Sequence, residues 1–328
     1  MPAPEGIEHS TARLQTACQV RFAGHGDRSR RIPNLSPLLH GQIVTVHGRH
    51  YTVEIAGGET LMCFPRGKRS LLACGDRVEV ARTAAHQGVI EAVDPRRTVL
   101  YRSERHRQKL IAANVTQMVI VLATVPSFYE ELLNRCLAAA AQQSIAALIV
   151  INKLDLIEPR ADALQALELY RELGYTLLPL TAKVDASPLQ PYLRGQVSVL
   201  VGQSGMGKST IVNGLFPDAR AEVGDVSFAL DSGRHTTTYS RLYRLDEDTA
   251  VIDSPGMQAF GLAHLTLAEL ASAYVEFRPY LGLCRFADCR HCDEPDCAIA
   301  AAAERGEISG RRLDLYRRLA RELQTRSR

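Results

Sequence analysis

Hydrophobic and polar residues alternate in five short segments between about residue 40 and residue 100. The segments are GQIVTVH, YTVEIA, ETLMCF, DRVEVAR and GVIEAV, and turn-forming pairs such as Gly57-Gly58 and Gly75-Asp76 separate them. Alternation with a period of two residues is typical of half-buried strands. Five such strands predict a small closed barrel. An OB-fold fits their number, and an SH3-like barrel fits nearly as well.

The pattern changes after residue 113. Unbroken apolar runs (VTQMVIVLA, IAALIVI, YTLLPL, VSVLVG and TAVIDS) alternate with helical stretches such as EELLNRCLAAAAQ and ADALQALELYREL. This alternation is typical of a doubly wound, mostly parallel sheet covered by helices. From about residue 266 the chain becomes helical, and it ends in a basic amphipathic helix near residues 311–323.

These patterns predict a multidomain protein in four parts. We expect a flexible basic arm over residues 1–35, an OB-fold barrel over 36–110, an α/β domain over 111–265 and a helical domain over 266–328. An arginine-rich segment of about ten residues, YRSERHRQKL, is predicted to link the barrel to the α/β domain.

Charge is unevenly distributed along the chain. The net charge of the 328 residues is +3, but residues 1–110 hold 17 Lys and Arg against 10 Asp and Glu, whereas residues 111–328 hold 22 against 26. A basic front either docks a polyanion or is a solvated surface, and charge alone favours neither reading. We find no apolar run of membrane-spanning length and no secretory leader at the N-terminus, so we expect a cytoplasmic protein with no membrane partner.

A phosphate-binding loop is indicated by the run GQSGMGKS, which fits the pattern G-x4-G-K-[ST]. An apolar strand precedes it and a helical stretch follows, so backbone N–H groups can cradle phosphate oxygens at a helix N-terminus. Lys208 is expected to contact the β- and γ-phosphates and Ser209 to bind Mg²⁺. The candidate nucleotide-binding residues here are Gly202, Gln203, Ser204, Gly205, Met206, Gly207, Lys208, Ser209 and Thr210.

Two further loops indicate which base is bound. The run Asn152, Lys153, Leu154 and Asp155 follows an apolar strand and resembles the N-K-x-D guanine motif of GTPases. Ligands bind at this end of the strands in such sheets. The Asp155 carboxylate is expected to accept hydrogen bonds from the guanine N1–H and amino group. Thr181, Ala182 and Lys183 resemble the S-A-K loop that reaches guanine O6, so GTP is favoured over ATP.

Two segments downstream have the features of nucleotide-sensing switches. The run from Asp253 to Gly256, DSPG, matches D-x-x-G, where the aspartate holds Mg²⁺ through a water and the glycine N–H senses the γ-phosphate. The segment GRHTTT is rich in hydroxyls, and one of its threonines is expected to complete the Mg²⁺ shell. We take Thr237 as a candidate catalytic residue beside Lys208, although which threonine binds the ion stays open.

Met257 follows the switch glycine at a position where many GTPases have a glutamine that orients the attacking water. A methionine side chain cannot orient a water, so another group must act or intrinsic hydrolysis must be slow. His235 in the switch is the candidate catalytic residue, and a surface histidine without a role is an equally good reading.

The order of these motifs is rotated. Conventional GTPases run phosphate loop, first switch, second switch, N-K-x-D and S-A-K, whereas here N-K-x-D and T-A-K come first. Joining the conventional termini and opening the chain between the second switch and N-K-x-D leaves every loop at the same sheet edge. Chain termini are usually exposed and close together, so a circular permutation of this kind is tolerated.

A cluster of cysteines near the C-terminal end indicates a metal site. Cys284, Cys289, His291 and Cys297 form a Cys3His set suited to one structural Zn²⁺ with no open position. Cys292 is an additional thiol that could replace Cys289 or His291, although adjacent ligands such as His291 and Cys292 are uncommon.

A barrel, a permuted GTPase and a Cys3His helical tail, in this order, resemble the bacterial family of small ribosomal subunit-dependent GTPase A proteins. The resemblance extends from about Leu38 and rests on the motifs above. It implies an OB-fold, a circularly permuted P-loop GTPase domain and a zinc domain, with GTP hydrolysis stimulated by the small (30S) ribosomal subunit late in its maturation. The family also places a catalytic histidine at the position of His235.

The expected partners are therefore the 30S subunit with its rRNA and GTP or GDP, and we expect a monomer. The expected cofactors are one structural Zn²⁺ and the Mg²⁺ that accompanies GTP. The alternatives are a nucleotide-responsive RNA-binding protein and a permuted GTPase of the large subunit. The N-terminal arm and Cys292 depart from the family pattern.

Overall fold

The computed structural model describes residues 37–67, 71–104, 107–156, 160–217, 240–254, 262 and 265–326. The predicted arm over residues 1–35 therefore lies outside the described part of the chain. Among the residues described here, we find no helix with the length and hydrophobicity that a membrane span requires.

The first five strands form the predicted barrel. They are β1 (Leu39–His47), β2 (His50–Ile55), β3 (Thr60–Pro65), β4 (Arg77–Ala84) and β5 (Gln87–Val93). The pairing order β1-β2-β3-β5-β4 closes because β4 also pairs with β1. Alternate side chains point inward and are fully buried, among them Ile43, Val53 and Leu61, so burial of one face selects the strand period. The OB-like barrel is thereby confirmed.

A hairpin follows where the sequence predicted a link. Strands β6 (Val99–Glu104) and β7 (Arg107–Ala113) pair antiparallel, and the hairpin spans the expected domain boundary at residue 110. Val99, Tyr101 and Leu110 pack in a small cluster with Ala73 and Ala113. The arginines in the middle of the segment conceal this apolar alternation at its two ends, so the sequence pattern did not predict the two strands.

The α/β part is built on five parallel strands in the order β10-β9-β8-β11-β13. They are β8 (Gln117–Ala123), β9 (Ala146–Asn152), β10 (Thr176–Pro179), β11 (Val197–Val201) and β13 (Ala250–Asp253). Met118, Ile120 and Leu122 face one apolar core, while Val119 and Val121 face another. Strands buried on both faces read as continuous apolar runs, which explains the runs seen in the sequence.

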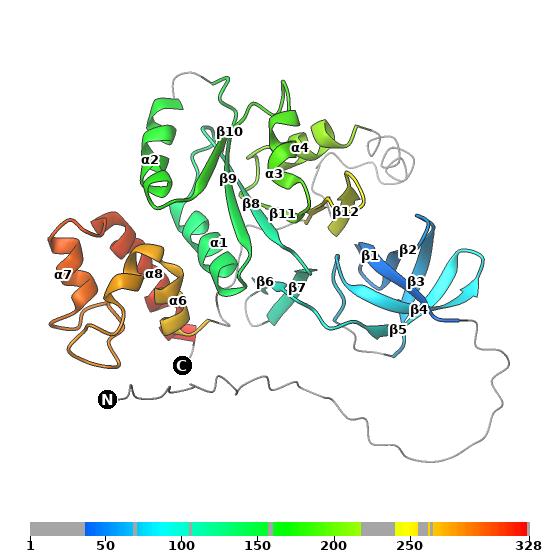
Figure 1. Ribbon diagram of the computed structural model, residues 1–328, viewed down its shortest axis with the longest axis horizontal. Helices are drawn as coiled ribbons and strands as arrows, with labels where there is room; N and C mark the ends of the chain where they lie inside the picture. The colour runs from blue at the N-terminus through cyan, green and yellow to red at the C-terminus, as the bar shows by residue number, and fades with distance from the viewer. Residues whose placement is uncertain are drawn as a thin grey trace, which may run out of the picture. The chain divides into compact units, whose positions relative to one another are not determined.

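Helices cover both faces of this sheet (Figure 1). Side chains of α1 (Glu130–Gln142) and α2 (Arg160–Glu172) belong to the first core. The short η1 (Ser187–Leu189) and α3 (Gln190–Leu193), together with α4 (Lys208–Leu215), contribute to the second. The predicted doubly wound architecture is confirmed.

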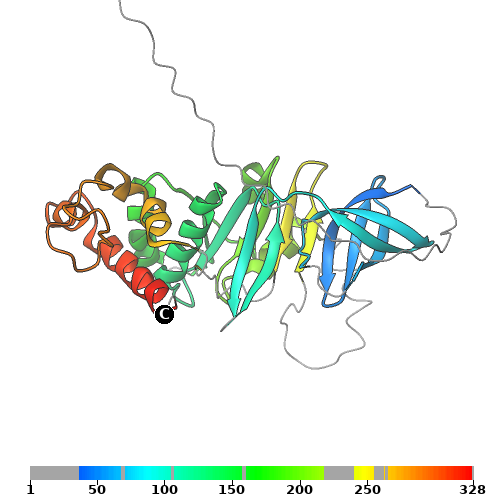
Figure 2. The same ribbon diagram turned by 90° about the horizontal axis from the view of Figure 1, so that it is seen from below.

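Strand β12 (Ser240–Arg244) was not predicted from the sequence. It pairs antiparallel with β13 on one side and with β1 of the barrel on the other. The barrel and the parallel strands therefore belong to one sheet of 11 strands. Figure 2 shows β12 and β13, in yellow, between the blue barrel strands and the green strands of the α/β part.

The C-terminal part contains α6 (Leu267–Ala273), η2 (Val275–Tyr280), α7 (Ala298–Glu304) and α8 (Gly310–Arg326). Thr266 starts α6 with a capping box, in which its hydroxyl accepts from the Glu269 N–H. Helix α8 contains the predicted basic amphipathic helix, and its apolar side contributes Leu313, Tyr316 and Leu319 to the first core. These side chains join the C-terminal helices to the α1 side of the sheet.

Candidate functional site

Four of the segments predicted to bind nucleotide lie at the ends of parallel strands. Asn152 ends β9 and residues 153–155 follow it, residues 181–183 follow β10, residues 202–207 follow β11, and Asp253 ends β13. Because these strands are parallel neighbours, their carboxyl ends meet at one edge of the sheet. The rotated order of the motifs along the chain therefore leaves them together in space.

Asn152 holds three of these segments in contact. Its Nδ2 donates to the carbonyl oxygen of Met206 in the phosphate loop at 3.0 Å. Its Oδ1 accepts from the backbone N–H of Ala182 in the T-A-K loop at 2.9 Å. The side chain is only 2% exposed, so water does not compete for these two hydrogen bonds. The asparagine thus braces the loops rather than facing a ligand.

Glycines in the phosphate loop are required by close approach. Gly202 has a φ of 145°, and a Cβ at this position would lie 2.2 Å from the carbonyl oxygen of Val121. Gly207 directly precedes α4 and has a φ of 93°, and a Cβ there would lie 2.2 Å from Nδ2 of Asn152. Only glycine combines these backbone angles with such contacts, so the loop packs directly against β8 and the base-recognition loop.

Lys208 and Asp253 form the charged centre of this edge. Lys208 Nζ donates to the carbonyl oxygens of Gly202 and Gln203, each at 2.7 Å. Burial lowers the pKa of Lys208, and the nearby Asp253 carboxylate partly opposes that shift. Burial likewise raises the pKa of Asp253, and the Lys208 charge opposes it. Both groups are thus partly desolvated, and each stabilises the charged form of the other.

The residues expected to touch ligand differ from the framework in exposure. Asp155, Lys183, Ser204, Ser209 and Thr210 are exposed, whereas Asn152, Ala182 and Met206 are buried. The exposed polar groups are therefore accessible to a ligand, and the buried residues beneath them form a packed framework. The switch candidates His235, Thr237, Gly256 and Met257 lie outside the described residues, and so do the other residues of GRHTTT.

Sequence reasoning missed one segment of this edge, residues 124–129 after β8. The carbonyl of Val125 accepts from Nζ of Lys153 at 2.7 Å, and the hydroxyl of Thr124 donates to the Lys153 carbonyl at 3.1 Å. The Tyr129 N–H at the start of α1 donates to Oε1 of Gln203 at 2.8 Å. No motif marks this segment, but its position after the strand between β9 and β11 is a usable signal.

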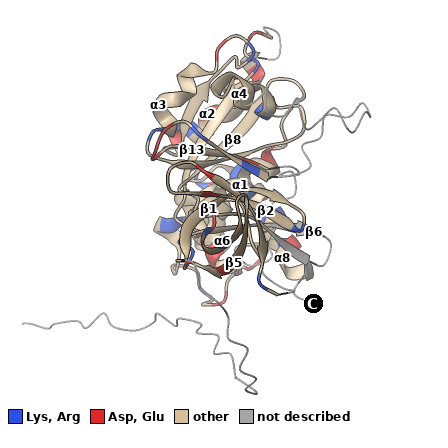
Figure 3. Ribbon diagram, turned by 90° about the vertical axis from the view of Figure 1, so that its right-hand side faces the viewer, with Lys and Arg blue, Asp and Glu red and all other residues tan. Residues whose placement is uncertain are grey.

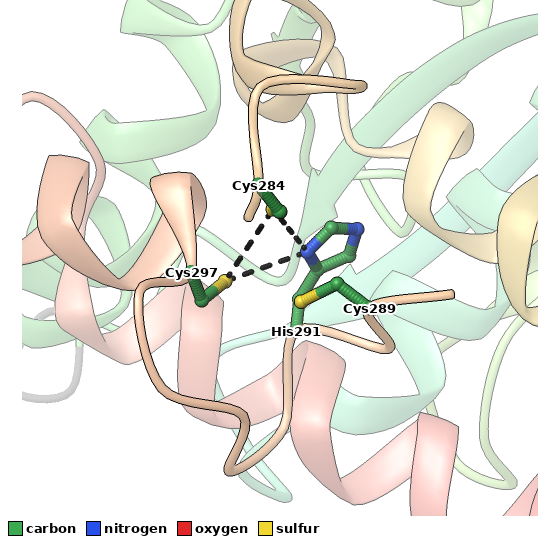
Figure 4. A group of neighbouring side chains, drawn as sticks. All are labelled: Cys284, Cys289, His291 and Cys297. Atoms are coloured by element: carbon green, nitrogen blue, oxygen red, sulfur yellow. Dashed lines mark hydrogen bonds between the residues drawn. The ribbon is translucent and has the colours of Figure 1, made fainter. Parts of the chain in front are cut away.

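The Cys/His cluster assembles between η2 and α7. The ligand atoms of Cys284, Cys289, His291 and Cys297 all lie within 4.8 Å of one another. The Cys284 and Cys297 sulfurs are 3.9 Å apart, and His291 Nδ1 lies 3.4 Å and 3.5 Å from them (Figure 4). Four donors about 2.3 Å from a common centre lie roughly 3.8 Å apart in a tetrahedron. These residues could therefore hold one metal ion.

Cys292 is separate from this group. Its sulfur contacts the Arg290 carbonyl at 3.6 Å, and its N–H donates to Glu294 at 3.0 Å. His291 has a φ of 59°, in the left-handed region of backbone conformation. The Tyr316 hydroxyl donates to the Arg290 carbonyl at 2.9 Å and so ties the loop to α8.

Comparison with known proteins identifies the relatives of this chain. The sequence profile of the RsgA GTPase family matches residues 93–263, which contain every nucleotide motif described above. The chain belongs to the RsgA GTPase family. Because the chain belongs to a family of GTPases and carries these motifs at one edge of its sheet, it is a GTP-hydrolysing enzyme.

Similarity extends beyond the GTPase part. A protein of Nitrosospira multiformis named "Small ribosomal subunit biogenesis GTPase RsgA" is 57% identical over 88% of this chain and 93% of its own length. A protein of Nitrosomonas europaea with the same name is 51% identical over 87% of this chain and 92% of its own length.

Two crystal structures have a similar fold. YjeQ from Thermotoga maritima has a TM-score of 0.68 at 30% identity and covers 88% of this chain and 99% of its own. YloQ, described as a circularly permuted GTPase, has a TM-score of 0.65 at 26% identity over 90% of this chain and 99% of its own. The permuted order predicted from the motifs is therefore a property of the fold.

Proposed function

We propose that this enzyme hydrolyses GTP on the small ribosomal subunit and acts as a late checkpoint in the maturation of that subunit. The observation that carries the proposal is the 57% identity to a small ribosomal subunit biogenesis GTPase over 88% of this chain. In the GTP-bound state the protein holds the immature subunit, and hydrolysis releases it.

The nucleotide roles follow from the arrangement of the sheet edge. Asp155 recognises guanine, with Lys153 lying along the base and the T-A-K loop reaching O6. Lys208 contacts the β- and γ-phosphates, and Mg²⁺ is held by Ser209 and, through a water, by Asp253. The exposed Asp155 and Ser209 and the buried brace Asn152 support this assignment.

Hydrolysis itself is assigned to the switch residues His235 and Thr237, with the Gly256 N–H sensing the γ-phosphate. Met257 stands where many GTPases have a glutamine, so basal turnover is slow and the subunit accelerates it. His235→Ala is expected to lower the stimulated rate while GTP binding is retained. Unchanged basal and stimulated rates in this variant would exclude the role of His235.

The barrel is the proposed rRNA-binding module. Several of its arginines are neutralised, since Arg66 pairs with Glu91 and Arg82 with Glu59. Figure 3 accordingly shows both signs of charge on this part of the chain. Arg49, Arg77 and Arg97 differ, because they are exposed and form no ion pair within the described residues. Such side chains can contact phosphates, and the binding they support weakens as salt rises.

Zinc is the metal that best suits the Cys3His cluster, because three thiolates and one imidazole match its preferred tetrahedral set. Four protein ligands leave no open position, so the ion is structural. We further propose a cytoplasmic monomer divided into the arm 1–35, the barrel 36–110, the GTPase part 111–265 and the zinc part 266–328.

Co-sedimentation with purified ribosomal subunits tests this proposal. We expect the protein to pellet with 30S subunits in a non-hydrolysable GTP analogue and to remain in the supernatant with GDP. Replacing Arg49, Arg77 and Arg97 by alanine together should weaken pelleting. Preferential binding to 50S subunits would instead favour a large-subunit GTPase, and binding to 30S without any nucleotide dependence would contradict a checkpoint.

A further inference from the structure

Strand β12 connects the barrel to the nucleotide edge. Its first residues pair with β1, with Ser240 opposite Val46 and Arg241 opposite Thr45. On its other side, Arg241 lies opposite Asp253 in β13. One short strand therefore pairs with both the barrel and the strand that ends in Asp253. Figure 2 shows this position between the two sets of strands.

Side chains reinforce the contact between β12 and the barrel at one end of the strand. Arg244 pairs with Glu54 of β2 through Nε, and its Nη2 donates to Oε1 of Gln42 of β1 at 2.7 Å. Both barrel residues lie on strands that also pair with each other. The arginine thus fixes β12 to two barrel strands at once.

A second contact lies at the opposite end of β12, beside the nucleotide edge. The Ser240 and Ser254 hydroxyls are 2.7 Å apart. Ser254 is the residue directly after Asp253 and is only 3% exposed, so water cannot easily replace its partner. The hydroxyl pair therefore restrains the backbone at the point where the second switch begins.

The geometry of Asp253 depends on this restraint. Asp253 ends β13, and its carboxylate lies near Lys208 in a partly desolvated position. A metal-bound water tolerates only small displacements of the carboxylate that holds it. The position of Ser254 relative to Ser240, and of Ser240 relative to β1, therefore sets the position of this carboxylate.

We infer that the barrel positions Asp253 for GTP hydrolysis through β12, with Ser240 and Ser254 as positioning residues. The inference rests on the proposed role of Asp253 as the carboxylate that holds Mg²⁺. It also provides a physical route by which an RNA contact on the barrel can alter the rate of hydrolysis.

The test measures the Mg²⁺ dependence of GTP hydrolysis without ribosomal subunits. In Ser254→Ala we expect the Mg²⁺ concentration for half-maximal activity to rise, and kcat to fall, by roughly 3- to 10-fold, the effect of losing one hydrogen bond. GDP affinity measured without Mg²⁺ should stay within about twofold of the native value. A merely structural role would change GDP affinity as well. Ser240→Ala should repeat the Ser254→Ala pattern, while Ser240→Thr, which keeps a hydroxyl, should retain native values.

Arg244→Ala separates the contribution of the barrel from that of the hydroxyl pair. It should raise the half-maximal Mg²⁺ concentration in the same direction, and combining it with Ser254→Ala should give less than the product of the two effects. Arg82→Ala is the matched control, because Arg82 forms a comparable ion pair with Glu59 inside the barrel.

Native Mg²⁺ dependence in Ser240→Ala, Ser254→Ala and Arg244→Ala would overturn the inference, as would an equal effect of Arg82→Ala. Ser240 is partly exposed, so its alanine variant keeps the test valid if Ser254→Ala does not fold. Because no subunits are present, failure of the native protein to bind 30S subunits would refute the proposed function without changing this result.

Discussion

Arg312 is the most deeply buried cation among the described residues, and its replacement gives a sharp test of how the C-terminal part is held. The residue is 1% exposed. Its Nε donates to Oε1 of Glu276 at 2.6 Å, and Nη1 donates to Oδ1 of Asn134 in α1. The guanidinium also lies 4.2 Å from the ring centroid of Tyr274. Although burial disfavours its charge, the hydrogen bond and charge of Glu276 raise its pKa.

We predict that Arg312→Met lowers the free energy of unfolding by about 3–5 kcal/mol. Methionine keeps much of the packing volume but leaves the Glu276 carboxylate buried without its partner, which is the costly result of breaking a buried ion pair. Adding Glu276→Gln to Arg312→Met should recover about 1–3 kcal/mol of the free energy of unfolding, because it removes the unpaired buried charge. Such recovery would show that the loss came from the charge and not from packing.

Urea unfolding followed by far-ultraviolet circular dichroism measures these changes, since the chain contains no tryptophan for fluorescence. With a slope of about 3 kcal/mol per molar urea, the midpoint of the unfolding transition should fall by about 1 to 1.7 M. Arg305→Met is the matched control, because the exposed Arg305–Glu307 pair should contribute less than about 1 kcal/mol. A loss below about 1 kcal/mol in Arg312→Met, or an equal loss in the control, would show that the buried Arg312–Glu276 pair does not stabilise the C-terminal part.

Three further predictions concern the nucleotide loop, the metal cluster and the barrel. Gly207→Ala should weaken binding of a fluorescent GTP analogue at least about tenfold, whereas Gly174→Ala, with a similar φ but no contact within 4 Å, should not. Elemental analysis should find about one zinc per chain, lost in Cys297→Ser and retained in Cys292→Ser. Burial lowers the pKa of His47, so the unfolded chain binds more protons and stability falls below about pH 6.5. Melting temperatures from about pH 7.5 to pH 5.5 should fall more in the native protein than in His47→Gln, and equal falls would exclude this cause.

Much of the fold was predictable from the sequence, because the spacing of apolar residues and the positions of turn-forming residues indicate the same elements along most of the chain. The five barrel strands, the parallel strands and α1 follow their patterns closely, since one buried face selects each period. Strand β12 was missed because its residues SRLYR include only Leu242 as a fully buried side chain. The segment forms a strand because it pairs with β13 on one side and β1 on the other, and no local sequence pattern indicates these pairings.

In the site too, features set by local sequence were predictable, whereas contacts between distant segments were not. The phosphate loop and the Cys3His set were recognisable because backbone cradles and metal ligands require particular residue types at fixed spacing. The segment of residues 124–129 was not recognisable from the sequence, because its contacts use backbone groups of Val125 and Tyr129 that any sequence offers. The connection of Asp253 to the barrel likewise depends on long-range pairing through β12, which lies between β13 and β1.

If this permuted GTPase acts on the small ribosomal subunit, the rate of phosphate release from GTP should depend on which ribosomal subunit is present. We expect slow release by the protein alone, a rise of at least about tenfold with purified 30S subunits, and no comparable rise with 50S subunits. ATP should give no stimulated release. A rate unchanged by 30S subunits, or one raised equally by 50S subunits, would exclude the small subunit as the specific partner of this enzyme.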